Sequence, residues 1–168
     1  MKRFLGLAFA ALLLSACQTP AVVKDVHLGA DIVYGGDVIA YYALIEALHV
    51  TPLYSTRSGF GLETSFQSPR KMYFLEAWSY GKQFDYVKGM TTKSVCLIQP
   101  CMPMSAEQGI MSMDEADFIA AASKGFEFEL VGKAGKIVGK VPAQAFRTVL
   151  DMKGRLKPPP TSPAAPAP

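Results

Sequence analysis

The chain has 168 residues and a formal net charge of +3, which comes from 17 Lys and Arg against 14 Asp and Glu. This length corresponds to one domain of ordinary size that can bury a substantial core. The charge excess is too small to indicate a nucleic-acid partner, and we expect none.

The first sixteen residues have the pattern of an export signal. A short cationic start, Met1-Lys2-Arg3, precedes an uncharged run of 13 residues, Phe4–Ala16, that is rich in Leu, Ala and Phe. An uncleaved transmembrane helix is the alternative, but it requires ~20 apolar residues. Removal of the signal leaves 152 residues, which carry 15 basic against 14 acidic side chains.

The apolar run ends in Leu14-Ser15-Ala16-Cys17, which resembles the lipobox of bacterial lipoproteins. The resemblance covers residues 1–17 and implies that a diacylglycerol is added to the Cys17 thiol and that cleavage falls between Ala16 and Cys17. The new amine would usually be acylated, and two acyl chains already hold a protein stably at a membrane. In the enteric version of this family an Asp after the cysteine favours the inner membrane, so Gln18 implies the outer membrane, facing the periplasm.

Assigning Cys17 to lipid leaves Cys96 and Cys101, which are separated by four residues. An even pair in an oxidising compartment predicts a disulfide, and closing so short a loop would contribute roughly 2 kcal/mol on the chain-entropy estimate. A metal site is one alternative, although structural zinc sites usually combine C-x2-C pairs with further Cys or His ligands. Two free thiols are the other alternative. We expect the disulfide, and neither a metal nor a cofactor.

Composition divides the mature chain into three parts. Residues 17–30 are polar and mixed, which is typical of a tether, and residues 31–155 form the globular domain. The tail, residues 156–168, consists mostly of Pro, Ala, Ser and Thr, a composition that favours extended polyproline and not a packed core.

In the first half of the domain, Val38–His49 carries one charged residue, which favours a buried helix that Asp37 would cap. The run Val38–Tyr42 could equally form a core strand. Residues 51–70 are rich in Thr, Ser, Gly and Pro, which predicts turns and at most a short strand over residues 53–56.

Three stretches of the second half have strand patterns. Met72–Trp78 is bulky and aromatic, and Gln83–Lys88 can return beside it after a turn. Residues 126–130 alternate between apolar and acidic side chains, which predicts a β-hairpin over residues 126–141 with one face buried.

Two helices complete the prediction. Ser112–Glu115 matches the capping-box pattern S-x-x-E before an apolar run, which indicates a helix over residues 113–124. Pro142 suits the first turn of a second helix over residues 142–152. Together these elements predict an α+β fold, with an antiparallel sheet of roughly four to six strands and two or three helices packed on one face.

Basic residues gather towards the end of the domain, where residues 133–157 hold seven Lys and Arg against one Asp. A solvated face explains such a run. The alternative is a contact surface for anionic lipid, lipopolysaccharide or an acidic partner. That candidate binding face consists of Lys133, Lys136, Lys140 and Arg147.

The sequence presents no complete catalytic set. A nucleophilic triad needs a His near Ser and Asp, and the two histidines, His27 and His49, are more simply surface or satisfied residues. Aromatic residues at Tyr73, Trp78 and Tyr80 could line a ligand cleft, although aromatics in a strand more often belong to the core.

These features predict a non-enzymatic cell-envelope protein, anchored to the membrane through lipid on Cys17, that binds or braces an envelope protein partner. The first alternative is a carrier of a small ligand or lipid with an aromatic-lined cavity. The second is an envelope hydrolase that uses His49 as its base.

Overall fold

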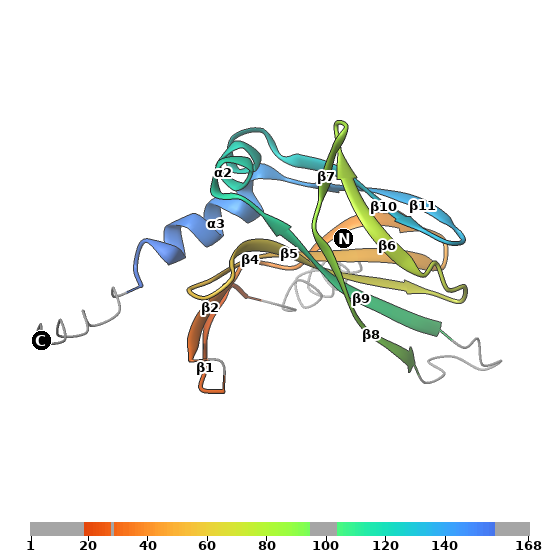
Figure 1. Cartoon of the computed structure of the whole chain (residues 1–168), viewed down its shortest axis with the longest axis horizontal. Helices are drawn as coiled ribbons and strands as arrows, with labels where there is room; N and C mark the ends of the chain where they lie inside the picture. The colour runs from red at the N-terminus through yellow and green to blue at the C-terminus, as the bar shows by residue number, and fades with distance from the viewer. Residues whose placement is uncertain (1–18, 28, 95–103, 157–168) are drawn as a thin grey trace, which may run out of the picture.

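A computed structural model describes residues 19–27, 29–94 and 104–156. Most of these residues lie in strands of two antiparallel sheets, and the described part of the chain contains two short helices, α2 (Glu115–Lys124) and α3 (Ala143–Lys153). The predicted α+β class is therefore wrong, because the fold is predominantly β and the helices cover one end of the sheets instead of a face (Figure 1).

The larger sheet has seven strands in the spatial order β1-β2-β4-β5-β9-β8, with β3 also paired to β4. Its strands are β1 (Ala21–Asp25), β2 (Ala30–Tyr34), β3 (Val38–Ala43), β4 (Glu46–Ser55), β5 (Gly59–Ser68), β8 (Tyr86–Ser94) and β9 (Met104–Met113). Both β2 and β3 run antiparallel to β4 and pair with its two halves in turn. They therefore lie end to end along the same side of β4, interrupted at residues 35–37, and β1 pairs with the other side of β2.

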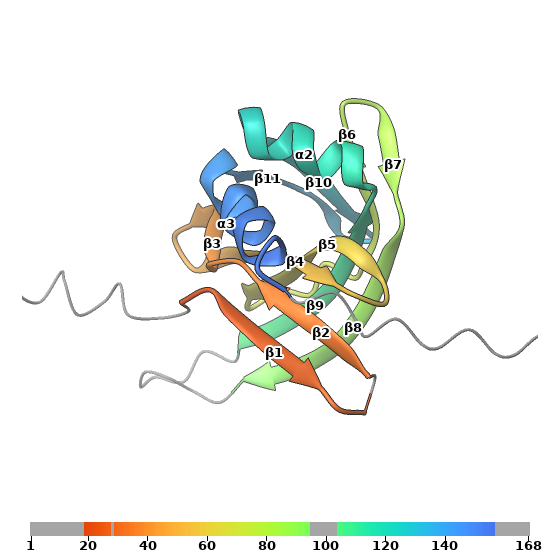
Figure 2. The same ribbon diagram turned by 90° about the vertical axis from the view of Figure 1, so that its left-hand side faces the viewer.

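The smaller sheet has the order β11-β10-β6-β7. Its strands are β6 (Phe74–Ser79), β7 (Lys82–Phe84), β10 (Phe126–Gly132) and β11 (Gly135–Val141). Only Asp85 separates β7 from β8, and its carbonyl accepts a hydrogen bond from the Ser112 N–H at 2.9 Å. The chain thus passes directly from one sheet to the other, and the two sheets curve around a common interior (Figure 2).

Buried aromatic side chains join both sheets to the helices. Phe118 of α2 stacks on Phe60 of β5 with ring centroids 4.4 Å apart, and its edge meets Phe146 of α3 at 5.0 Å. Phe118, Phe128 and Phe146 are almost fully buried. Burial of a side chain of this size contributes about 1.5–3 kcal/mol, so α2 and α3 are held across the open end of the sheets by their apolar faces.

The helix predicted over Val38–His49 is wrong, and the segment forms β3, a turn and the first part of β4. The turn falls at Leu44, which has a φ of +28° and is 89% exposed. Leu44 and Ile45 are not residues that favour hairpin turns, so the sequence carries no local signal for the reversal. The alternative prediction of a strand over Val38–Tyr42 agrees with β3, whose β-branched and aromatic residues favour a strand.

Residues 51–70, which predicted turns, form the second half of β4 and the whole of the central strand β5. The small residues of β5 permit close packing: a Cβ on Gly61 would lie 2.9 Å from the Met111 carbonyl oxygen. The buried Thr64 hydroxyl bonds to the Gly109 carbonyl at 3.1 Å. Part of the predicted tether is also a strand, since β1 lies within residues 17–30.

The C-terminal third agrees with the sequence prediction. The helix expected over residues 113–124 is α2, the hairpin over residues 126–141 is β10–β11, and the helix over residues 142–152 is α3. The capping residue of α2 is Asp114, whose carboxylate accepts from the Asp117 N–H at 2.7 Å. Pro142 is the N-cap of α3. Local patterns suffice here because each element carries its own start signal.

One buried carboxylate connects the two sheets. Glu107 of β9 is 4% exposed and accepts hydrogen bonds from the backbone N–H groups of Met72, Tyr73 and Phe74 at 2.5, 2.7 and 3.3 Å. Tyr73 has a φ of +56°, which is uncommon for a bulky residue. Glu107 therefore holds the chain where it leaves β5 and enters β6.

Replacing Glu107 should destabilise the fold strongly. In Glu107→Ala three N–H groups lose their acceptor, two of them on buried residues, and we expect a loss of about 3 kcal/mol in the free energy of unfolding. Glu129→Ala removes an exposed ion pair with Lys136 and should cost less than about 1 kcal/mol. Urea unfolding of both variants measures the difference, and equal stabilities would contradict the role of Glu107.

Candidate functional site

The cysteines of the predicted anchor and disulfide, Cys17, Cys96 and Cys101, lie outside the described residues, as do residues 157–168 of the predicted tail. No helix in the described part of the chain is long and apolar enough to cross a membrane. The anchor and the disulfide stay predictions.

The four residues of the predicted basic face come from three elements. Lys133 lies in the β10–β11 turn, Lys136 and Lys140 lie on β11, and Arg147 is exposed on α3. On the outer face of the smaller sheet, Lys136 pairs with Glu129 at 2.9 Å and Lys140 pairs with Glu127 at 2.8 Å. Cross-strand glutamates thus offset the charge of the two β11 lysines.

The three aromatic residues considered for a cleft do not share one. Tyr73 and Tyr80 are 44% and 85% exposed, and the Trp78 indole donates to Glu76 at 2.7 Å. Trp78 and Tyr80 line an open hollow of about 380 Å³ at the smaller sheet, to which Tyr73 does not contribute. The interior between the sheets is occupied by the buried core.

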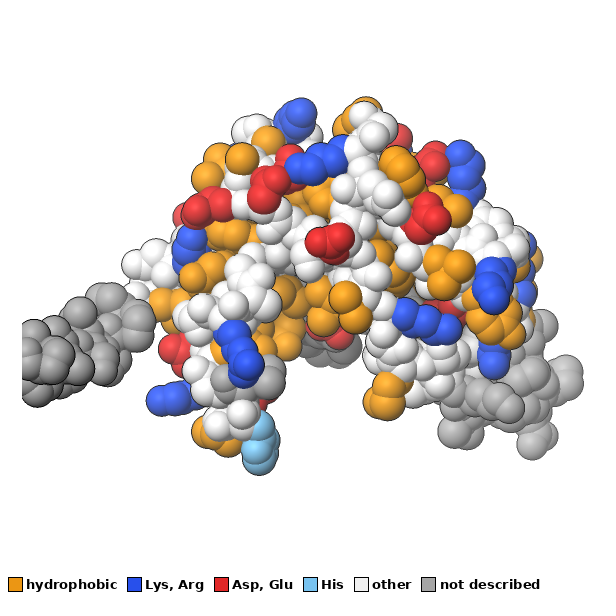
Figure 3. Space-filling view, viewed as in Figure 1, with side chains coloured by type: hydrophobic (Ala, Val, Ile, Leu, Met, Phe, Trp, Pro, Cys, Tyr) orange, Lys and Arg blue, Asp and Glu red, His pale blue; other side chains and the backbone are white. Residues whose placement is uncertain are grey.

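A larger hollow, the polar groove, lies on the outer face of the seven-stranded sheet. Its volume is about 560 Å³, and the surface is hollowed between the β1–β2 hairpin and the β8–β9 side of the molecule (Figure 3). Most of its lining side chains carry hydrogen-bonding groups. The lining residues are Thr19, Ala21, Tyr34, Gly35, Asp37, His49, Thr51, Glu63, Ser65, Gln67 and Gln108.

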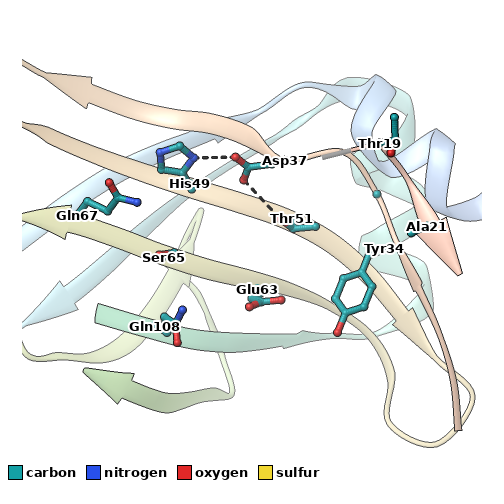
Figure 4. A pocket seen from close by; sticks show the side chains of 11 residues that line it. Thr19, Ala21, Tyr34, Asp37, His49, Thr51, Glu63, Ser65, Gln67 and Gln108 are labelled. Atoms are coloured by element: carbon teal, nitrogen blue, oxygen red, sulfur yellow. Dashed lines mark hydrogen bonds and ion pairs between the residues drawn. The ribbon is translucent and has the colours of Figure 1, made fainter. Parts of the chain in front are cut away.

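Strand register places the groove residues in rows. Ser65 of β5 lies opposite His49 of β4 on one side and opposite Gln108 of β9 on the other. Glu63 lies opposite Thr51 in the next row on the same face. Since successive side chains of a strand point to opposite faces, the apolar residues between them face the core and the polar ones face the groove (Figure 4).

The interruption between β2 and β3 brings an acidic side chain over this face. The Gly35 N–H donates to the Pro52 carbonyl at 2.7 Å, and a Cβ on Gly35 would lie 3.0–3.1 Å from Val149 and from two backbone oxygens. Glycine at this position lets the strand pass close to α3 and β4. Two residues later, the Asp37 carboxylate points towards β4 (Figure 4).

Asp37 orients His49. One carboxylate oxygen, Oδ2, lies 2.7 Å from His49 Nδ1, and the other accepts from the Thr51 hydroxyl at 3.4 Å. A carboxylate at Nδ1 favours the tautomer that carries its proton there, which leaves Nε2 as an acceptor when the ring is neutral. Asp37 and His49 thus form an oriented pair, and within the described residues no hydroxyl is hydrogen-bonded to His49 Nε2.

At the other end of the groove, Tyr34 lies near Glu63. Burial raises the pKa of the Tyr34 hydroxyl, and the negative charges of Glu63 and Asp25 raise it further. The Glu63 carboxylate accepts no hydrogen bond and forms no ion pair within the described residues. It is therefore a charged acceptor open to a ligand.

The groove is consequently rich in acceptors and negative in charge. Asp37 and Glu63 contribute two carboxylates, and none of the lining residues that the structure describes is Lys or Arg. The described residues contain no group of three or more His, Cys, Asp or Glu that could hold a metal ion. The groove can therefore bind a donor-rich ligand.

Sequence reasoning identified His49 as a candidate base but did not identify its partner. The pattern of Val38–His49 predicts a helix capped by Asp37, whereas the segment forms β3 and the start of β4. A signal for the groove was nevertheless present, since Glu63, Ser65 and Gln67 recur at every second position, the spacing of one strand face.

Searches of protein-family models, curated proteins and solved structures find no match to this chain.

The contact with Asp37 predicts the tautomer of His49. At a pH high enough to keep the ring neutral, we expect the proton on Nδ1 in the wild type and mainly on Nε2 in Asp37→Ala. Imidazole ¹⁵N chemical shifts distinguish the two forms, and His27, whose ring has no described partner, is an internal control. The same tautomer in both proteins would contradict the orienting role of Asp37.

The charge of Glu63 predicts a change in the titration of Tyr34. Because the carboxylate raises the pKa of the tyrosine, Glu63→Gln should lower that pKa while burial keeps it above the ordinary value. Titration of the Tyr34 ring signals by NMR measures the shift. Tyr86, whose raised pKa has burial as its main cause, should titrate as in the wild type; an unchanged Tyr34 would show that Glu63 does not act on it.

Proposed function

We propose that this chain is a non-enzymatic, lipid-anchored protein of the cell envelope that binds a partner through its polar groove. The observation that supports the proposal is the groove itself, an open hollow of about 560 Å³. Several of its polar side chains, Glu63 and Ser65 among them, have no hydrogen-bond partner within the described residues. A solid core lies beneath it, which favours binding at the surface over carriage of a ligand inside.

The position of the groove agrees with an anchor at Cys17. Thr19 lines the groove and follows Cys17 by two residues, and two residues of extended chain span only about 7 Å. A lipid on Cys17 would therefore hold the groove close to the membrane surface. A partner in this position would belong to the membrane or to material next to it, on the periplasmic side of the outer membrane.

The anchor is tested by the intact mass of the protein purified from its native envelope in detergent. We expect a chain that begins at acylated Cys17 and gains two hydrogens on reduction, as a Cys96–Cys101 disulfide requires. A chain without lipid would remove the anchored function, while an unchanged mass on reduction would remove the disulfide alone.

The role of the groove is tested by cross-linking in the envelope with two matched variants. Ser65→Arg fills the groove with a large cation, and Val138→Arg places the same side chain on the outer face of the smaller sheet, where Val138 is 36% exposed. We expect Ser65→Arg to lose the wild-type cross-linked product and Val138→Arg to retain it. Loss in both variants, or in neither, would contradict binding through the groove.

The Asp37–His49 pair favours one second candidate, an envelope hydrolase in which Asp37 orients His49 as a general base for water. Hydrolysis of envelope material by the wild type and its loss in His49→Ala would support that function. Absence of products from the wild type, or equal turnover by His49→Ala, would eliminate it.

A further inference from the structure

We propose that the ligand of the polar groove is a glycan that carries a free amine. The inference deepens the proposed function, because it rests on the groove being the binding surface, but it does not require the lipid anchor. Three properties of the groove support this ligand class. They are its charge, the polar side chains that have no partner within the described residues, and the backbone groups of its floor, which are already hydrogen-bonded within the sheet.

The charge of the groove selects a cation. Glu63 is half-buried in the floor and has no hydrogen-bond donor or counter-ion within the described residues. The Asp37 carboxylate lies 2.7 Å from His49 Nδ1 and accepts a longer hydrogen bond, of 3.4 Å, from the Thr51 hydroxyl. Among the described residues, no Lys or Arg lines the groove. A ligand ammonium placed on Glu63 would form a charge-assisted hydrogen bond.

The remaining lining side chains match hydroxyl groups. Ser65 lies in the floor between Gln67 and Glu63, and Gln108 lies beside it on β9 (Figure 4). Within the described part of the chain, none of the side chains of Ser65, Gln67 and Gln108 has a hydrogen-bond partner. An amide offers both donors and an acceptor, so these side chains can bind several neighbouring hydroxyls. A simple polyamine would leave them unused.

The backbone of the floor favours a glycan over a peptide strand. Each of β4, β5 and β9 has a hydrogen-bonded strand on both sides, so their N–H and C=O groups are already committed to the sheet. Peptides that add to a sheet bind through free backbone groups at its edge, which this floor does not provide. Recognition must therefore use side chains, and the ring of Tyr34 adds an apolar surface at one end of the groove.

The test is calorimetric titration of the full-length protein in detergent with two oligosaccharides that differ only in the amine. The probes are the β-1,4-linked tetramer of glucosamine and the same tetramer of N-acetylglucosamine, whose nitrogen is neutral. We expect the free-amine tetramer to bind at least about tenfold more tightly, as a charge-assisted contact implies.

Two matched variants test whether the ligand amine contacts Glu63. Glu63→Gln keeps the size of the side chain and removes its charge, and it should weaken binding of the amine tetramer about tenfold without lowering the melting temperature. Glu129→Gln removes a carboxylate from the smaller sheet and should leave binding unchanged.

Each remaining outcome overturns the inference. Equal binding of the two tetramers would show that the amine is not recognised. Spermidine binding as tightly as the amine tetramer would indicate a surface that selects charge alone, and a lysine-rich peptide binding more tightly would identify a protein ligand. No binding of either tetramer would reject this ligand class, while a lipidated mass and a cross-linked partner would still leave the proposed function in place.

Discussion

The fold depends on the buried carboxylate of Glu107. It reaches from β9 of the larger sheet to three successive backbone N–H groups at the entry to β6 of the smaller sheet. Burial of a carboxyl group is costly unless it is hydrogen-bonded, and Glu107 accepts three hydrogen bonds. The contact fixes where the chain leaves one sheet for the other, and thereby how the two sheets face each other across the phenylalanine core.

In the described part of the chain, no helix or sheet packs on the outer face of the larger sheet. The helices occupy the end of the molecule, held by Phe118 and Phe146, and the smaller sheet covers the inner face. The polar side chains on β4, β5 and β9 therefore meet solvent. The interruption between β2 and β3 places Asp37 above them, so a groove with an oriented histidine and an open glutamate forms on an otherwise regular sheet face.

Local sequence patterns predicted the elements correctly where residues that mark the start of an element stand next to it in the chain. The helix α2 has the anionic cap Asp114, α3 has Pro142, and the hairpin between them has clean alternation. Such patterns failed over Val38–His49 because the hairpin turn at Leu44 lacks turn residues, and over residues 51–70 because small residues in β5 have the composition of turns. In both segments the sheet neighbours, and not local preference, decide the conformation.

The sequence by itself determined the pattern of an export signal with a lipobox-like end, the cysteine pair that predicts a disulfide, and the helix–hairpin–helix unit of the C-terminal third, because these depend on residues close together in the chain. Only the tertiary structure showed that the fold is predominantly β and that a polar groove forms on the larger sheet. Asp37 and His49, Glu63 and Tyr34, and Ser65 and Gln108 are separated by 12 to 43 residues, and strand register across several long-range pairings brings them together. Register depends on which faces the whole core buries, which no local pattern contains.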